Sequence, residues 1–343
     1  MTAVSPTTRP LPHPLSIRPG RDEDAEGYIR LIGTAWAEYP NCVLDVDGEV
    51  PELRALATYF ATAGGAVWVA EAGGRIVGMV ATRPLGSDRA WEICKMYVEA
   101  SQRGSGLAHT LLGGAEAHAQ AEGAERLVLW TDTRFEAAHR FYEKRGYVRA
   151  GSIRILDDIS KSLEFRYAKP ARGLVVEALD AAAAASAERN LAEMLVTCVA
   201  DGACLDYRAP LAPEVARAAW RRVSAEVAMG SRLLLVAWKE GRMAGSVQLD
   251  LGTPQTQPHR AVVAQLLVHP DFRRQGVGRA LLQRAEQAAR GIGRSLLTLD
   301  GRAGDAAERL YRALGWVEAG RIPGFVRNPD GSLGDQLFFY KAL

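Results

Sequence analysis

A stretch in the second half of the chain combines arginines and glycines in a way that suits binding of a phosphate group. Arg273, Gly276 and Gly278 follow the apolar run 266–268, and the pattern from 279 to 288 is helical. Backbone N–H groups at a helix start have no internal partner, and the helix dipole favours an anion there. Glycines let a phosphate approach the backbone. The spacing differs from the dinucleotide and nucleoside-triphosphate loops, so a different phosphate-bearing ligand is expected.

The same device occurs earlier in the chain. The strand-like run 96–98 precedes Arg103, Gly106 and Ala108, each 170 positions before its counterpart. Two further blocks repeat at nearly the same distance: 141–147 matches 310–316, and 69–78 matches 236–245. One long offset shared by three blocks indicates a duplicated domain rather than a short solenoid repeat.

The repeat predicts the domain organisation. We expect a flexible tail at 1–14, a first domain at 15–168, a linker at 169–173 and a second domain at 174–343. Two domains of this size are natural for a chain of 343 residues.

The motif Gln/Arg-x-x-Gly-x-Gly/Ala after a strand resembles the acyl-coenzyme A pyrophosphate loop of the GNAT acetyltransferase superfamily, and the resemblance covers nearly the whole chain twice. It implies an α/β fold with two tandem domains, each a mixed, mostly antiparallel sheet flanked by helices. It also implies acetyl-CoA as co-substrate, no metal, and a splayed strand pair for the pantetheine. The residues expected to bind the coenzyme are Met96, Tyr97, Val98, Arg103, Gly104, Ser105, Gly106, Leu107, Ala108, Leu266, Leu267, Val268, Arg273, Arg274, Gln275, Gly276, Val277, Gly278 and Arg279.

Two tyrosines stand where the superfamily has an acid for the departing thiolate. Tyr142 and Tyr311 lie in the matching helical blocks, each just before a glycine that ends the helix. A phenol can donate a proton while its ring packs in a core. The resemblance therefore implies a catalytic role for both, although core packing alone would also explain an aromatic residue there.

Carboxylates are the candidates for the base that the reaction needs, because an ammonium cannot attack a thioester. Glu92 lies six residues before the end of its strand, where similar acetyltransferases use a glutamate directly or through water; an ion pair is the structural alternative. Asp132 is a second candidate in this half. The second half has Val262 at the glutamate position and offers Asp300, which could orient or deprotonate the amine or could cap a helix.

The second half resembles most closely the tabtoxin-resistance acetyltransferases, which acetylate a small amine. The residues that carry this are the 268–282 block, Asp300, Tyr311 and the tail 320–331. The leading hypothesis is transfer of acetyl to a primary amine of a small molecule by direct attack. A peptide or protein amine, a mycothiol-synthase-like acceptor, or a non-catalytic coenzyme-binding half are alternatives.

The composition narrows the partners. A net charge of +2 argues against a general nucleic-acid or membrane-surface binder, and no apolar run approaches the length of a membrane helix. Four cysteines without a C-x-x-C pair predict free thiols in a reducing cytoplasm, and six scattered histidines make a metal site improbable. We expect a cytoplasmic monomer or homodimer.

The apolar and turn patterns also predict individual elements. In the first half we expect strands at 15–18, 66–71, 76–82, 90–98 and 127–131, helices at 51–63, 107–122 and 135–145, and a last strand pair at 147–154 and 163–167. The second half is expected to repeat this order.

Overall fold

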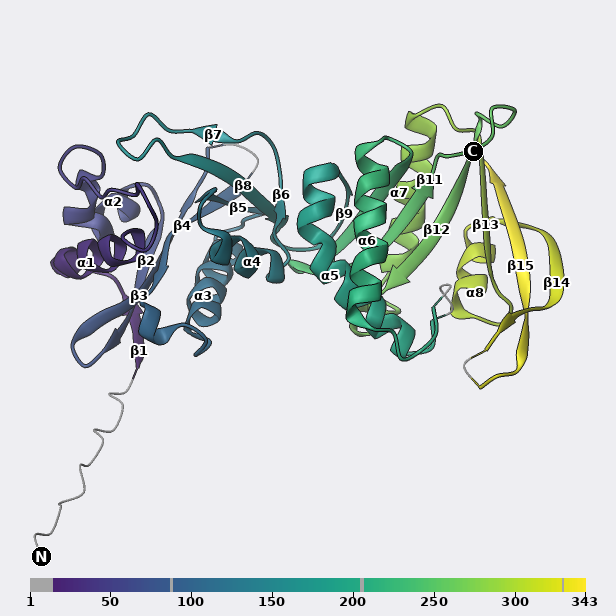
Figure 1. The fold of residues 1–343 in the computed structure, drawn as a ribbon, viewed down its shortest axis with the longest axis horizontal. Helices are drawn as coiled ribbons and strands as arrows, with labels where there is room; N and C mark the ends of the chain where they lie inside the picture. The colour runs from purple at the N-terminus through teal and green to yellow at the C-terminus, as the bar shows by residue number, and fades with distance from the viewer. Residues whose placement is uncertain (1–14, 87–88, 204–206, 329) are drawn as a thin grey trace, which may run out of the picture. The chain divides into compact units, whose positions relative to one another are not determined.

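The computed structural model describes residues 15–86, 89–203, 207–328 and 330–343. The expected tail at 1–14 lies outside the described residues, as does Cys204. The chain forms two compact units (Figure 1). The first contains residues up to 135 together with 153–165, and the second contains 136–152 with 166–343. We describe each unit by itself.

A mostly antiparallel sheet forms the first unit. Its strands run in the order β1-β2-β3-β4-β5-β8; β1 to β4 pair with one another antiparallel, and β4 pairs with β5 in parallel. The short β7 pairs with the start of β8. The bounds are β1 (Ser16–Pro19), β2 (Ala66–Ala72), β3 (Arg75–Pro84), β4 (Ala90–Val98), β5 (Arg126–Asp132), β7 (Arg154–Ile155) and β8 (Leu163–Pro170, which continues into the second unit).

Helices cover the sheet of the first unit. α1 (Ala25–Trp36) and α2 (Leu56–Thr62) bury Tyr28, Phe60 and their neighbours against β2 and β3. α3 (Leu107–Ala121) packs on β3, where the Leu111 side chain lies so close to Gly78 that an added Cβ would meet it at 2.9 Å. The remaining turns are the short 3-10 helices η1 (Asp22–Asp24), η2 (Pro51–Ala55) and η3 (Ala100–Gln102).

The second unit is built on a seven-stranded sheet in the order β14-β15-β13-β12-β11-β10-β9, again with one parallel pair, β12 and β13. It also holds α4, β6 and the end of β8 from the first repeat. The bounds are α4 (Glu136–Lys144), β6 (Val148–Arg149), β9 (Leu174–Leu179), α5 (Ala181–Ala200), α6 (Pro213–Ala228), β10 (Arg232–Lys239), β11 (Arg242–Asp250), β12 (Arg260–Val268), η4 (Pro270–Phe272), α7 (Val277–Gly291), β13 (Leu296–Arg302), α8 (Ala306–Ala313), β14 (Val317–Arg327) and β15 (Leu333–Ala342).

The end of the first repeat is packed against the first helix of the second. Asn190 of α5 donates to the Glu143 carbonyl at 2.9 Å, and the Arg149 N–H donates to the Ser186 hydroxyl at 2.9 Å. Val148 of β6 is buried in the cluster formed by α5, α6 and β10. Within this unit, α4 and β6 therefore depend on α5 for much of their packing.

The two repeats share a β-bulge at the same place. Lys95 in β4 has φ 51° and Gln265 in β12 has φ 46°, and the strand registers shift at both points. A positive φ is uncommon outside glycine, so the bulge is a defined feature of both sheets.

The predicted fold class is confirmed: both sheets are mixed, mostly antiparallel and flanked by helices. Two expected elements were wrong in detail. The helix at 51–63 begins as the 3-10 turn η2, and the strand at 147–154 is interrupted between β6 and β7. β8 extends to Pro170, and the next residue, Ala171, is buried. Arg172 and Gly173 then connect this buried end of β8 to the exposed first residue of β9. Among the described residues, no helix has the length and apolarity needed to cross a membrane.

Candidate active site

A splayed strand pair lies in each repeat. β4 pairs with β5 only over residues 90–93, and β12 pairs with β13 only over 260–262. Beyond these points the parallel strands part, so the last residues of β4 and β12 leave backbone groups without a partner on that side. Unpaired N–H and C=O groups suit an amide-bearing chain such as pantetheine. Met96, Tyr97 and Val98 end β4, and Leu266, Leu267 and Val268 end β12.

The first loop, 103–108, opens α3 with two glycines in the left-handed region. Gly106 is the residue preceding the helix, with φ 91°, and Gly104 has φ 78°. A Cβ added at either position would meet no atom within 4 Å. Arg103 to Gly106 are exposed, while Leu107 is buried under the sheet. The loop therefore presents open backbone at a helix start, which fits a pyrophosphate.

The second loop repeats this geometry before α7. Gly276 has φ 85°, and Arg274 takes a φ of 62° at the place of Gly104. The φ angle of Gly278 does not lie in the left-handed region, so its backbone conformation does not require glycine. Instead, a Cβ there would lie 3.0 Å from the Leu310 side chain, so this glycine permits close packing. Val277 is buried, and Gln275 donates to the Asp271 carbonyl at 2.7 Å.

The leading arginine of each loop is already paired with a carboxylate at the end of the repeat's first helix. Arg103 forms two hydrogen bonds of 2.7 Å with Glu38, and Arg273 is ion-paired with Asp201. By contrast, Arg274 and Arg279 are exposed and make no ion pair with the residues that the structure describes. These two guanidinium groups are therefore the ones immediately free for phosphate oxygens.

Tyr311 occupies the position expected of the thiolate acid in the second repeat. Its ring is 94% buried between Phe339 and Trp316, against Gly301 at the end of β13. Its hydroxyl hydrogen-bonds to none of the described residues. Burial, together with the negative charges of Asp300 and Asp305, raises the pKa of Tyr311, so the phenol keeps its proton at neutral pH.

Asp300 lies inside β13 with its side chain exposed, and it accepts a hydrogen bond from Gln336 of β15. It does not cap α8, because Asp305 is the residue that precedes that helix. Gln336 is buried, and its own side-chain oxygen has no partner among the described residues. The helix-capping interpretation of Asp300 is thus wrong, and its carboxylate is open to solvent.

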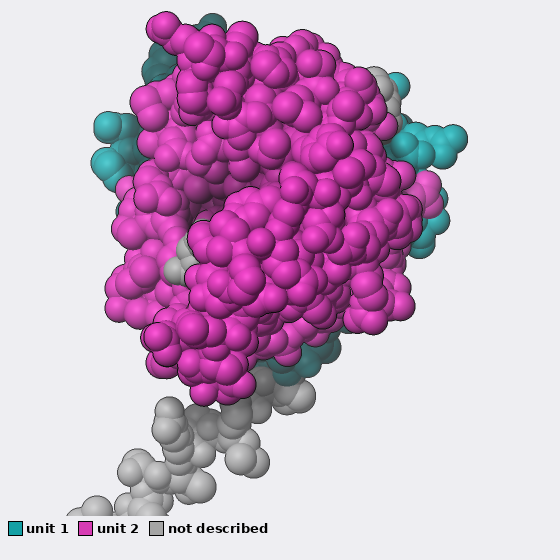
Figure 2. Space-filling model, turned by 90° about the vertical axis from the view of Figure 1, so that its right-hand side faces the viewer, with its two compact units in different colours: residues 1–135, 153–165 teal, residues 136–152, 166–343 magenta. Residues whose placement is uncertain are grey.

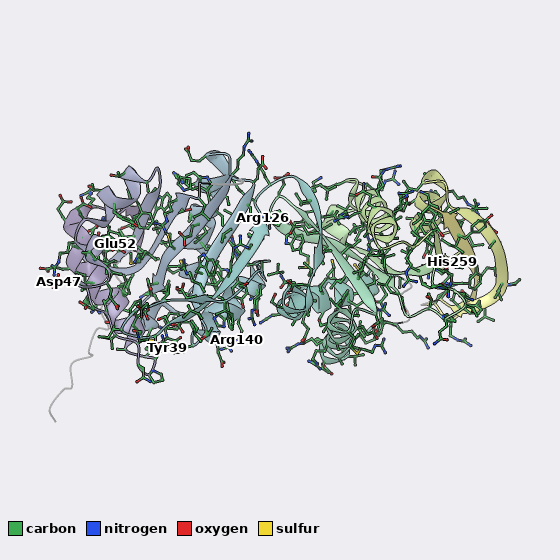
Figure 3. All side chains as sticks on the ribbon, turned by 90° about the horizontal axis from the view of Figure 1, so that it is seen from above. Tyr39, Asp47, Glu52, Arg126, Arg140 and His259 are labelled. Carbon is green, nitrogen blue, oxygen red and sulfur yellow. The ribbon has the colours of Figure 1, made fainter. Side chains whose placement is uncertain are left out.

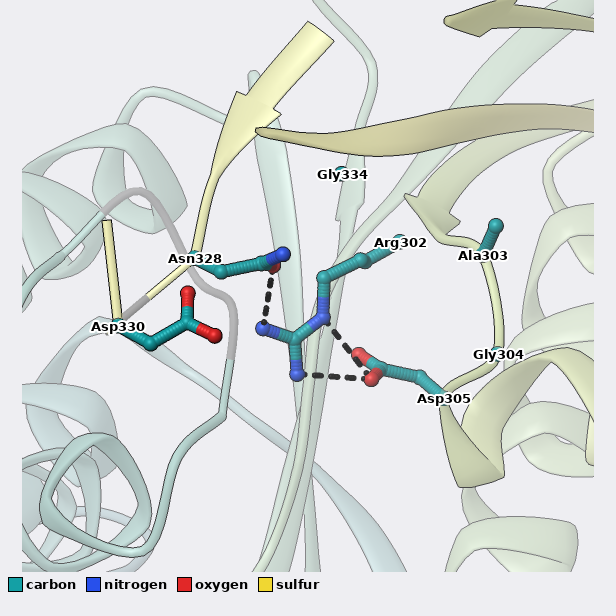
Figure 4. A pocket seen from close by; sticks show the side chains of 7 residues that line it. All are labelled: Arg302, Ala303, Gly304, Asp305, Asn328, Asp330 and Gly334. Carbon is teal, nitrogen blue, oxygen red and sulfur yellow. Dashed lines mark hydrogen bonds and ion pairs between the residues drawn. The ribbon is translucent and has the colours of Figure 1, made fainter. Parts of the chain in front are cut away.

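A cavity of about 470 Å³ lies at the end of β13 (Figure 4). Figure 2 shows the hollowed surface of the second unit. Arg302 crosses the cavity and donates to Asp305 at 2.8 Å and to Asn328 at 3.2 Å. The sequence analysis did not name Arg302 or Asp305, whereas Asn328 lies in the tail 320–331 that it did name. The lining residues are Arg302, Ala303, Gly304, Asp305, Asn328, Asp330 and Gly334.

Glu92 lies in the first unit and is 6% exposed. Arg83, directly opposite on β3, holds its carboxylate with contacts of 2.8 and 2.7 Å and also donates to the Tyr59 hydroxyl at 3.0 Å. The ion-pair alternative for Glu92 is thus what the structure shows. Its Oε2 atom is engaged by both the Nε and the Nη2 of Arg83.

Asp132 ends β5 and is bound by Arg134 in the same unit. Burial alone would raise its pKa, but the hydrogen bonds and charge of Arg134 hold the pKa of Asp132 below its usual range. Arg134 also donates to the Asn41 and Ser160 carbonyls. The guanidinium therefore ties the end of β5 to the segments on either side of it.

Glu164 is a neighbouring carboxylate that the sequence analysis missed. It pairs with Arg154, whose guanidinium stacks 4.3 Å from the Trp130 ring centre. Burial raises the pKa of Glu164 in spite of Arg154, with smaller contributions from the charges of Asp132 and Glu92. Only its alternation with apolar residues in β8 could have drawn attention to it.

Tyr142 lies on α4, in the second compact unit, whereas Glu92 and the 103–108 loop lie in the first. Its ring packs near those of Tyr147 and Phe141, at 6.0 and 5.4 Å. It is 7% exposed, as a core aromatic would be. Polar side chains such as those of Asp47 and His259 lie on the surfaces of both units (Figure 3).

The chain matches curated proteins over part of its length. It is 30% identical over 159 residues to the mycothiol acetyltransferase of Thermobispora bispora, which is 42% of this chain and 52% of that protein. It is 33% identical to the N-acetylaspartate synthetase of Danio rerio (33% and 39%) and 28% identical to N-acetyltransferase 8F1 of Rattus norvegicus (35% and 54%). The chain thus spans about half or less of these relatives' length.

Solved structures of similar fold align with about one half of the chain. A Salmonella typhimurium protein with its cofactor acetyl-CoA has a TM-score of 0.42 at 20% identity, covering 50% of this chain and 94% of that one. The ribosomal-protein-alanine N-acetyltransferase of Brucella melitensis has 0.42 at 22%, covering 49% and 99%.

The model of the acetyltransferase (GNAT) family matches residues 30–147 and again 203–316, which is more than half of the chain. Each match includes one splayed strand pair and one glycine-bearing loop. The chain belongs to the GNAT acetyltransferase family, with two tandem copies of its domain.

Proposed function

We propose that the second half transfers an acetyl group from acetyl-CoA to a primary amine of a small molecule. The observation that carries this proposal is the polar cavity of about 470 Å³ at the end of β13. Cavities of a few hundred cubic ångströms are typical of small-molecule sites. Tyr311 supports the same assignment, because its hydroxyl has no hydrogen-bond partner among the described residues. Burial and the charge of Asp300 raise its pKa, and so does the charge of Asp305, which lines the cavity.

Different residues of the chain bind the coenzyme and transfer the protons of the reaction. The N–H groups and arginines at 273–279 hold the pyrophosphate, and the free edge of β12 receives the pantetheine. Asp300, open to solvent, accepts the proton of the acceptor ammonium directly or through water. Tyr311 donates its proton to the departing thiolate sulfur. The protein's further contribution is to place amine and thioester together.

The first half is proposed to bind the coenzyme with little or no turnover. Its loop 103–108 has the open backbone that a pyrophosphate requires. Its expected base, Glu92, is buried and ion-paired with Arg83 through one carboxylate oxygen. If this half does turn over, Glu92 or Asp132 would act as base and Tyr142 as acid.

The similarity to mycothiol acetyltransferase supports a second candidate acceptor, an amine on a small aminosugar conjugate. An acceptor of the tabtoxin-resistance type, another small amine, is proposed for the same cavity.

Isothermal titration calorimetry of the full chain with acetyl-CoA tests the coenzyme sites. Gly276→Glu and Gly106→Glu each place a carboxylate where a pyrophosphate should bind, and each variant should lose one site. The matched Gly→Ala variants introduce only backbone strain, so they should weaken binding less. Release of free thiol with a panel of amines then measures turnover. Absence of coenzyme binding to the wild-type chain would refute the proposal.

A further inference from the structure

We propose that the cavity at the end of β13 selects an acceptor that carries a second cationic group, as a diamine or polyamine does. This inference rests on the proposed function, since it names the class of acceptor for that site. Three of the lining side chains are charged: Arg302, Asp305 and Asp330. The lining therefore has a net charge of one negative unit.

The arginine of the cavity is not available to an anionic ligand. Its Nε and Nη2 donate to Asp305 at 3.0 and 2.8 Å, and its Nη1 donates to the Asn328 side chain at 3.2 Å. Nη2 also donates to the Gly202 carbonyl at 3.3 Å. Figure 4 shows this guanidinium held between the two side chains. An acceptor carboxylate would have to displace these contacts, which disfavours acidic amines.

Asp330 supplies the excess negative charge, because the single guanidinium of Arg302, which also acts on Asp330, already pairs with Asp305. One of its oxygens accepts from the Ser332 N–H at 2.9 Å and from the Ser332 hydroxyl at 2.6 Å. These bonds lower the pKa of Asp330, so the carboxylate is ionised at neutral pH. Its other oxygen has no hydrogen bond among the described residues. The turn thus fixes a carboxylate with one free face beside the cavity.

Two neighbouring arginines do not cancel this charge at the cavity. Arg321 is ion-paired with Asp335 at 3.3 Å, and Arg327 donates to the Gly331 carbonyl at 3.1 Å on the turn. Neither residue lines the cavity. Glu308, at the start of α8, is likewise occupied by the Gly304 N–H and by Arg312.

The spacing along β13 suits two charges on one short ligand. Asp300 and Arg302 are two residues apart on this strand, so their α-carbons are separated by roughly 7 Å. An acceptor whose reacting amine lies near Asp300 would extend its second ammonium, a few methylene groups away, along β13 toward the cavity that Asp305 and Asp330 line. This is the arrangement of a short aliphatic diamine.

Three amines of one chain length test the inference with the full-length protein: 1,4-diaminobutane, butylamine and 4-aminobutanoate. They present a cationic, a neutral and an anionic tail. We expect kcat/KM to fall in that order, by about fivefold per step at low ionic strength, and the differences to shrink in high salt. Asp330→Asn should lower the ratio of diaminobutane to butylamine about fivefold, chiefly through KM. Glu214→Gln, an exposed site on α6, is the matched control and should leave the ratio as in the wild type.

The outcomes separate this inference from the proposed function. Turnover with no preference, or with 4-aminobutanoate preferred, would overturn the inference and leave acetyl transfer standing. If the protein binds acetyl-CoA but acetylates none of the three, the proposed function fails for this class. Calorimetric titration with 1,4-diaminobutane in the presence of coenzyme A then decides: binding that is lost in Asp330→Asn supports the cationic site, and absence of binding refutes it.

Discussion

Tyr311 combines a buried ring with a hydroxyl that has no partner among the described residues. The hydroxyl oxygen keeps some exposure, so it can meet a bound ligand. The raised pKa keeps the proton in place until it is needed.

Tyr311→Phe should lower kcat about 100-fold without changing the affinity for acetyl-CoA, because only the proton donor is removed. Stopped-flow turnover and calorimetry measure the two quantities. Tyr340→Phe on β15, a half-exposed tyrosine, is the control. An equal loss in both variants, or a loss of coenzyme affinity with Tyr311→Phe, would assign Tyr311 to packing. With wild-type protein, the rate should show no decline near pH 10 from this phenol, since its pKa lies above the ordinary value.

Glu92 illustrates the opposite case, a carboxylate whose structural role is evident. Glu92→Gln leaves Arg83 half-buried without its counter-charge, and we expect a loss of about 3 kcal/mol of unfolding free energy. Thermal unfolding followed by circular dichroism measures it. Glu125→Gln breaks an exposed pair with Arg89 and should change stability by less than about 1 kcal/mol. Similar effects of the two substitutions would contradict the importance of burial here.

At the level of elements, the bulges of β4 and β12 lie just beyond the last residues that pair with the parallel strands β5 and β13. Gln265 holds its positive φ while accepting a hydrogen bond of 2.8 Å from Gln248. The bulge thus combines backbone strain with a specific side-chain contact.

Gln265→Val should destabilise the protein more than Gln265→Gly, by about 2 kcal/mol, because a β-branched residue is strained at this φ whereas glycine is not. Both variants lose the Gln248 contact, so the difference isolates the backbone term. Chemical denaturation with a fluorescence readout would check this. If the valine variant is the more stable one, the bulge is not required in the folded state.

The accuracy of the sequence analysis followed the strength of local signals. The strand at 90–98 was located to the residue and the loops to their glycines, because proline, glycine and apolar runs mark them directly. The partners of Glu92 and Asp132 were not predictable, since Arg83 and Arg134 reach them only through strand register and a turn. The cavity at Arg302 was missed for the same reason: Asn328 and Asp305 meet it from separate elements.

At the level of the whole molecule, the compact units do not coincide with the sequence repeats. α4 and β6 belong to the first repeat by sequence but pack with α5. The repeat-based boundaries 15–168 and 174–343 remain a prediction about the unit that was duplicated.

A fragment of residues 136–343 should be more stable than one of residues 174–343, by at least 5 °C in Tm. The shorter fragment uncovers the apolar surface of α5 around Leu191 and leaves the Asn190 amide and the Trp238 indole N–H without their partners, the Glu143 and Gly146 carbonyls. Differential scanning calorimetry of the two fragments gives the answer. Equal Tm values would show that α4 and β6 contribute nothing to the second unit.

The packing of α4 and β6 on α5 also bears on how such a protein evolves. Once one copy of a duplicated gene supplies part of the other copy's core, deletion of either is penalised through folding, whatever each copy still catalyses. Mutations in the first copy's reactive groups are then tolerated, while its loss is not. One copy can therefore change from an enzyme to a scaffold or a sensor. The protein cannot readily return to a single domain, because the remaining copy would lack part of its packing.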